Sequence, residues 1–90
     1  MTLIRELVGA ELRAARVEQG RTLRQLAATA RVSVGHLSEL ERGLTEPSSE
    51  LVAALCEELG YSVSGLLARA AMRGRVAEAG KPVAVKSIAA

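Results

Sequence analysis

The sequence predicts an all-α fold of five short helices. Glycines recur at about the length of a helix, and a serine or threonine that can cap the next helix follows most of them. Leucines and alanines between these glycines repeat every three or four residues. The 90 residues include one tyrosine and no Phe or Trp, which suits closely packed helices. We expect one domain at residues 3–73 and a flexible C-terminal tail at residues 74–90.

The first helix is expected at residues 3–19 because its apolar side chains fall on one face and Gly20 follows it. These side chains are Ile4, Val8, Leu12 and Ala15. The second helix is expected at residues 23–30, with Thr22 as its cap and Gln25 completing a capping box. A tight turn then leads to a third helix, which Ser33 caps and which ends before Gly43.

The fourth helix is expected to begin after Ser48 or Ser49, which follow Pro47, and to end at Gly60. It presents Leu51, Val52, Leu55, Cys56 and Leu59 to the core. The fifth helix begins after Ser62 or Ser64 and runs to about Arg73. Beyond Gly74 the helical periodicity is lost, apart from room for one more turn before Gly80.

Composition excludes several classes of function. A single cysteine permits neither an intrachain disulfide nor a cysteine-clustered metal site, and burial as a small hydrophobe is favoured over a redox role for it. The only histidine, His36, cannot form a metal site alone. No catalytic pair or cofactor motif is present, so we predict no enzyme, no cofactor and no metal. The apolar runs are too short for a membrane span, and we expect a soluble cytoplasmic protein.

Charge is distributed unevenly along the chain, although the net charge is only +2. Between Arg21 and Arg42 there are four arginines and two glutamates, whereas residues 43–60 hold four glutamates and no basic residue. From Arg69 onward five basic residues accompany a single glutamate. A domain with such an asymmetry can orient itself on a polyanion.

The second and third helices, joined by a short turn, form a helix-turn-helix pattern, in which the third helix enters the major groove of DNA. Leu37 and Leu40 point inward on that helix, which leaves a set of small or polar residues outside near its N-terminus. This set consists of Val34, Gly35, Ser38 and Glu39, with Arg42 at the far end.

The residues around this pattern resemble the Cro/CI-type (XRE) family of lambda-repressor-like helix-turn-helix domains over roughly residues 4–67. The matching elements are Ala27, Val32-Ser33, the "ERG" of residues 41–43 and Pro47-Ser48. More narrowly, the chain is similar to the actinobacterial ClgR/PopR-like activators of Clp protease genes. The resemblance implies a transcription regulator that binds double-stranded DNA as a homodimer on an inverted repeat.

The resemblance also assigns roles to individual residues. Val34, Gly35, Ser38 and Glu39 occupy the positions that face base edges, where a glutamate can accept from cytosine and valine can contact a thymine methyl. Arg16 and Glu41 match positions that pair in relatives. Residues expected at the DNA backbone are Thr22, Ser33, His36, Arg42, Ser48 and Ser49. At the position of Leu23 the family usually has a glutamine that contacts the DNA backbone. We expect Arg21 or Arg24 to make that contact instead.

Several residues have two interpretations. Gly35 is either a weak point of the helix, at a cost of roughly 1 kcal/mol relative to alanine, or clearance for close approach to DNA. Glu39 either reads a base or repels wrong sites. His36 is expected beside the phosphates, with a weak pH-dependent contact.

Regions outside the helix-turn-helix suggest further partners. The fifth helix offers a candidate dimer surface at Val63, Leu66, Leu67 and Ala70, although the same leucines can instead close the core. The glutamates of residues 46–58 form a solvated surface, part of which can contact RNA polymerase. The terminal Ala89 and Ala90 are either an unstructured end or, by the resemblance, a degradation signal for Clp protease.

Two other functional classes fit the same pattern. A DNA-binding antitoxin would fold its tail onto a toxin. A protein-interaction module would keep the fold without binding DNA. Steep loss of DNA affinity with rising salt separates DNA-binding proteins from the interaction module.

Overall fold

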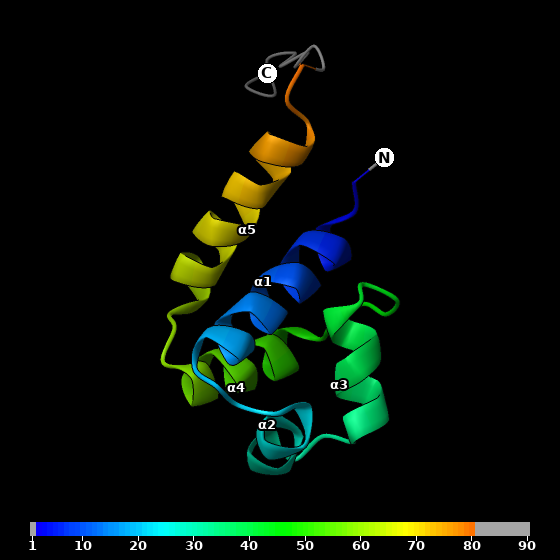
Figure 1. The fold of residues 1–90 in the computed structure, drawn as a ribbon, viewed down its shortest axis with the longest axis vertical. Coiled ribbons are helices and arrows are strands. Elements are labelled where there is room, and N and C mark those ends of the chain that lie inside the picture. The colour runs from blue at the N-terminus through cyan, green and yellow to red at the C-terminus, as the bar shows by residue number, and fades with distance from the viewer. Residues whose placement is uncertain (1, 81–90) are drawn as a thin grey trace.

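The computed structural model describes residues 2–80, and within them the chain forms five helices and no strand (Figure 1). The helices are α1 (Ile4–Glu18), α2 (Leu23–Ala30), α3 (Val34–Glu41), α4 (Ser49–Leu59) and α5 (Val63–Ala77). The predicted all-α fold and the expected order of elements are confirmed.

Side-chain caps begin four of these helices, as the sequence predicts. The Thr22 hydroxyl accepts the Gln25 N–H at 3.1 Å, and the Gln25 side chain accepts the Thr22 N–H at 2.8 Å, which completes the capping box of α2. Serine hydroxyls accept the N–H three residues ahead at the start of α3, α4 and α5. The caps of α4 and α5 are Ser48 and Ser62, so the two open choices are decided against Ser49 and Ser64.

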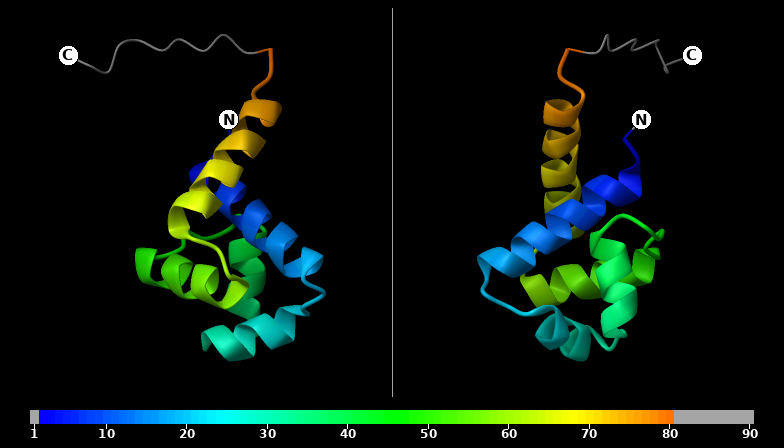
Figure 2. Two further views of the ribbon diagram at one scale, coloured as in Figure 1. Left: turned by 90° about the vertical axis from the view of Figure 1, so that its left-hand side faces the viewer. Right: turned by 45° about the vertical axis from the view of Figure 1, so that its right-hand side comes forward.

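Helix α1 lies in the middle of the molecule and packs against α5 on one side and α3 on another. Helices α2 and α3 contact each other at one end of the molecule, and α4 packs against α2 and α5 (Figure 2). The N-terminal end of α1 and the C-terminal end of α5 lie at the opposite end (Figures 1 and 2). The helix-turn-helix pair is thus supported from behind by α1 and α4.

The core is built from aliphatic side chains of all five helices. Its buried members are Val8, Leu12, Ala15, Leu26, Ala27, Leu37, Leu40, Leu55, Cys56, Leu59, Leu66 and Ala70. The prediction for Ile4 is wrong, because it begins α1 a full turn before Val8 and its side chain is 76% exposed. Cys56 is buried as expected, and desolvation raises the pKa of its thiol.

Helix α5 ends later than the sequence predicts. It continues past Arg73 to Ala77, so residues 74–77 belong to the helix and not to a flexible tail. Gly74 lies within the helix and is buried where α5 packs against α1, and a Cβ there would lie 3.0 Å from Cδ1 of Leu7. The expected break at this glycine is therefore a helix–helix contact.

Membrane spans and metal clusters were also expected to be absent. Within residues 2–80 no single helix is long and apolar enough to cross a membrane, and α4 with α5 reach that length and hydropathy only as a pair bent by 97°. The same residues contain no group of three or more His, Cys, Asp or Glu placed to hold a metal ion.

Candidate nucleic-acid interface

Helix α3 lies at the edge of the molecule with one face in the core and the other in solvent (Figure 1). Leu37 and Leu40 are fully buried and fix the helix to the domain. Val34, Gly35 and Glu39 are exposed, and Ser38 is partly exposed beside them. The predicted outward set therefore forms one solvent-facing surface at the start of α3.

An ion pair ties α1 to the end of α3, as predicted. Arg16 donates from Nε to Oε2 of Glu41 at 2.8 Å and from Nη2 to Oε1 at 2.9 Å, a bidentate pair. The Nη1 group of Arg16 also donates to the Arg21 carbonyl at 2.9 Å. Hydrogen bonding to Glu41 raises the pKa of Arg16, against a smaller opposing effect of burial. This pair holds α3 at a fixed angle to α1.

Gly9 makes the same helix crossing possible, and the sequence analysis did not identify it. A Cβ built on Gly9 would lie 2.3 Å from the Leu40 carbonyl oxygen and 3.0 Å from that of Glu41. The backbones of α1 and α3 thus approach more closely than any side chain permits. The only sequence signal is a glycine in the interior of an otherwise favourable helix.

The residues expected at the DNA backbone are exposed or partly exposed, and Arg21 differs from the others in its contacts. Thr22 and Arg24 are exposed at the start of α2, Ser48 and Ser49 are exposed at the start of α4, and Arg42 is exposed at the end of α3. The backbone N–H of His36 donates to the Ser33 hydroxyl, and its side chain is partly exposed.

Arg21 is the exception, because its guanidinium already has partners within the domain. Its guanidinium donates to the Glu58 carbonyl at 2.7 Å and to the Thr29 hydroxyl at 3.3 Å. It also lies 3.7 Å from the Glu58 carboxylate. These contacts hold Arg21 against the last turn of α4, and its role at the DNA backbone stays a prediction.

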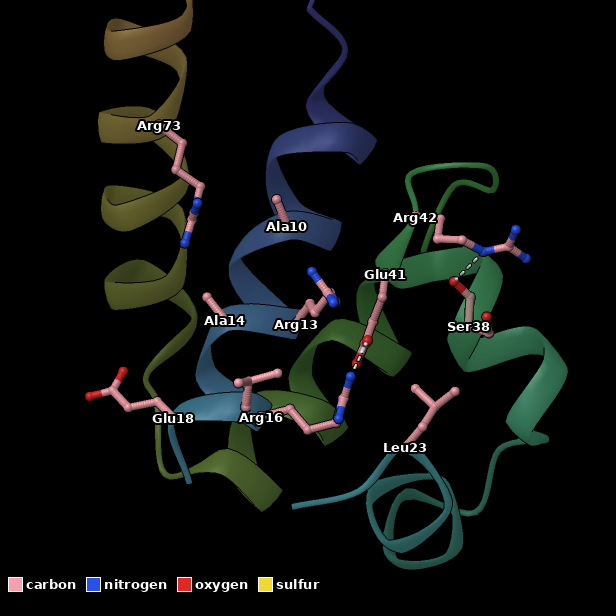
Figure 3. A pocket seen from close by; sticks show the side chains of 11 residues that line it. Ala10, Arg13, Ala14, Arg16, Glu18, Leu23, Ser38, Glu41, Arg42 and Arg73 are labelled. Carbon is pink, nitrogen blue, oxygen red and sulfur yellow. Dashed lines mark hydrogen bonds and ion pairs between the residues drawn. The ribbon is translucent and has the colours of Figure 1, made fainter. Parts of the chain in front are cut away.

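An open groove of about 860 Å³ runs beside α3 (Figure 3). One wall comes from α1, and Ser38 and Arg42 of α3 form the other, with Leu23 from the start of α2. The lining residues are Ala10, Arg13, Ala14, Arg16, Val17, Glu18, Leu23, Ser38, Glu41, Arg42 and Arg73. Four of these are arginines and two are glutamates, so the groove is predominantly cationic.

Comparison with known protein families gives a match at residues 12–66, to the family described as Helix-turn-helix. The chain belongs to the XRE-type helix-turn-helix family. ClgR, a transcriptional regulator of Mycobacterium tuberculosis, is 55% identical to this domain over 71 residues, which are 79% of this chain and 63% of ClgR. The chain therefore spans 63% of the length of this curated relative.

Solved structures agree with this assignment. A crystal structure of the clp gene regulator ClgR from Corynebacterium glutamicum superimposes on this helix-turn-helix domain with a TM-score of 0.85 and 51% identity, covering 87% of this chain and 83% of that one. A second has a TM-score of 0.78 and 53% identity, covering 81% and 95%. DdrOP3 of Deinococcus deserti, an HTH-type transcriptional regulator, is 45% identical over 56 residues, 62% of this chain and 43% of DdrOP3.

The predicted dimer surface on α5 of this helix-turn-helix domain is only partly available. Leu66 and Ala70 are buried in the core against α1, so their assignment to a dimer surface is wrong. Val63 and Leu67 are 42% and 50% exposed, as a contact surface requires. The same helix also exposes Met72 and Val76, which the sequence analysis did not single out.

A buried carboxylate between α1 and α5 was also missed. Glu11 is buried, accepts a hydrogen bond from Nε of Arg73 and lies 3.7 Å from Nη1 of Arg69. Arg69 in turn lies over the ring of Tyr61, 5.3 Å from its centre. These contacts fix α5 to the helix-turn-helix domain. Ala89 and Ala90, the predicted degradation signal, lie outside the described residues.

Proposed function

We propose that this chain is a sequence-specific DNA-binding regulator of transcription that acts on Clp protease genes in the cytoplasm. The similarity to ClgR across the whole helix-turn-helix carries the proposal, because it includes the helix that would read DNA. The exposed outer face of α3 and the fixed angle of α3 to α1 support it. The family is one of regulators and not of enzymes.

In this proposal α3 lies in the major groove, which is about 12 Å wide and admits one helix. Glu39 accepts a hydrogen bond from a cytosine amino group, and Val34 contacts a thymine methyl group. Ser38 can donate to a base or accept from one. Gly35 presents no side chain, and an added Cβ would meet no protein atom within 4 Å. The space it leaves is therefore open to a base pair.

Phosphates on either side of the groove would fix the position of the domain. The free N–H groups at the starts of α2 and α4, next to Thr22 and Ser48, can bind phosphate oxygens. Arg24 on α2 and Arg42 after α3 supply exposed guanidinium groups. The side chain of Leu23 has no hydrogen-bonding group, so it contributes no side-chain contact to a phosphate.

We further propose a homodimer on an inverted repeat, because a single helix reads too few base pairs to select a site in a genome. The exposed Val63 and Leu67, one helical turn apart on α5, would contribute to the interface. The centres of the half-sites should then lie about 10 base pairs apart, one turn of DNA.

Two further partners belong to the same proposal. Glutamates at residues 46–58 would offer a contact to RNA polymerase, of which Glu46 pairs with Arg5 and Glu58 with Arg21. Residues 81–90, which include Ala89 and Ala90, would let Clp protease limit the amount of the regulator. Replacing both alanines by aspartate should lengthen the cellular half-life, and an unchanged half-life contradicts this role.

Quantitative DNA binding tests the proposed function. The purified chain is titrated with duplexes from the regions upstream of Clp protease genes and with scrambled duplexes of equal length. We expect tighter binding to the former and a steep linear fall of log affinity with log salt concentration. Absence of binding, or binding without salt dependence, would favour the protein-interaction module instead.

A further inference from the structure

We propose that Arg13 on α1 is a DNA-backbone contact, which binds a phosphate in the groove between α1 and α3 opposite Arg42. The proposal rests on the proposed function, because it assumes that α3 lies in the major groove. By this proposal α1 contacts a phosphate as well, in addition to the starts of α2 and α4.

The position of the groove places Arg13 on the DNA side of the molecule. The same groove is lined by Ser38, a proposed base-reading residue, and by Leu23 at the start of α2. Arg13 and Arg42 both line this groove, and Figure 3 shows Arg13 on α1 beside Glu41 and Arg42 at the end of α3 with its guanidinium directed away from α1. A DNA strand that borders α3 would therefore pass the mouth of this groove.

The charges in the groove leave two cations for a ligand. Arg16 is neutralised by Glu41, and Arg73 by Glu11. Among the described residues, neither Arg13 nor Arg42 has a carboxylate within 4.0 Å. The remaining carboxylate in the lining, Glu18, is exposed in the last turn of α1.

Arg42 and Arg13 also have hydrogen-bond donors to offer. The Nε of Arg42 donates to the Ser38 carbonyl at 3.3 Å, which leaves its two terminal amino groups for other acceptors. The side chain of Arg13 is exposed, and it makes no hydrogen bond or ion pair with another residue in the described part of the chain. Two guanidinium groups on opposite walls of one groove suit the oxygens of a phosphodiester, which Arg can bind through two hydrogen bonds.

Leu23, which stands where the family usually has a glutamine, leaves a phosphate contact that Arg13 can make. A polar side chain there would reach the strand that passes the start of α2, but leucine cannot donate a hydrogen bond. Arg13 lines the same groove from the neighbouring helix and carries both a positive charge and five N–H donors. Arg13 thereby supplies from α1 the phosphate interaction that Leu23 cannot make.

The test compares Arg13→Ala with Arg75→Ala, a control on the exposed last turn of α5 that removes the same charge away from the groove. Binding is followed by fluorescence anisotropy over a range of salt concentrations. The probes are a duplex of about 25 base pairs that the unmodified protein enriches from a random library and a scrambled version of it. Thermal unfolding confirms that each variant is folded.

We expect Arg13→Ala to weaken binding to both duplexes about threefold to tenfold and to reduce the salt slope by about 0.9, the value for one phosphate. The ratio of the two affinities should not change, because phosphates carry no sequence information. Arg13→Lys should keep the slope. Equal behaviour of Arg13→Ala and Arg75→Ala overturns the proposal for Arg13, whereas failure of the unmodified protein to enrich any duplex from the library overturns the proposed function itself.

Discussion

Replacing Gly35 by alanine separates two explanations for a glycine in the first turn of α3. An added Cβ would meet no atom of the protein within 4 Å, and the backbone there has no positive φ angle. The variant should therefore gain helix propensity at no steric cost, about 0.5 to 1 kcal/mol of unfolding free energy. For a domain of this size that gain raises Tm by about 2 to 8 °C, measurable by thermal unfolding followed by circular dichroism.

DNA binding of the same variant should change in the opposite direction. The new methyl group would project from the face of α3 that is proposed to meet the base pairs, and it would hold the helix away from them. We expect the enriched duplex to bind about tenfold more weakly, with a smaller change for the scrambled duplex.

A matched control is Ala53→Gly, a change at an exposed position of α4. It should lower stability by about 1 kcal/mol and leave DNA affinity unchanged. If Gly35→Ala stabilises the domain and binds the enriched duplex as tightly as the unmodified protein, clearance for DNA is refuted and Gly35 is only a weak point. A loss of stability would refute the reasoning from open space.

Four further substitutions test the packing that positions the site. Gly9→Ala should lower the unfolding free energy by about 1–3 kcal/mol in urea titrations, because its Cβ would collide with the Leu40 carbonyl 2.3 Å away; an unchanged midpoint contradicts this contact. Glu41→Gln should lower the unfolding free energy by about 2–4 kcal/mol, because Arg16 loses its carboxylate partner. Arg16→Lys should also lower it, because lysine cannot form the bidentate pair. Burial raises the pKa of the Cys56 thiol, so stability is complete below the thiol's unfolded pKa of about 8.5 and declines as pH rises above it. Cys56→Ala should remove that decline in urea titrations at pH 8 and above; an equal slope in both proteins would show that another group causes it.

Local signals in the sequence account for most of the fold. Caps such as Thr22 and Ser33 act within one turn of the chain, and a buried leucine every three or four residues fixes the inner face of each helix. For this reason the helix starts and the outward face of α3 could be predicted. The pairing of Arg16 with Glu41 came from the family resemblance, since these residues are 25 positions apart.

Features that depend on the packing of distant helices could not be predicted in this way. Glu11 meets Arg73 across 62 positions, and nothing in the local pattern of either helix distinguishes this carboxylate from an exposed one. The end of α5 was misplaced for a related reason, because Gly74 marks a helix end in local terms and a close crossing in the folded chain. Arg21 is basic and lies next to the helix-turn-helix, yet its guanidinium donates to the Glu58 carbonyl in the last turn of α4.

Helix α1 connects the proposed DNA-reading and dimer surfaces through three of its residues. Gly9 permits the crossing with α3, Arg16 fixes the angle of that crossing, and Glu11 binds the arginines of α5 on another side of the same helix. If two chains join through the exposed residues of α5, the separation of their α3 helices is therefore set by a rigid connection through α1. A substitution at Glu11 would then change the preferred spacing of half-sites without touching DNA, whereas a substitution at Arg13 would change affinity at every spacing alike.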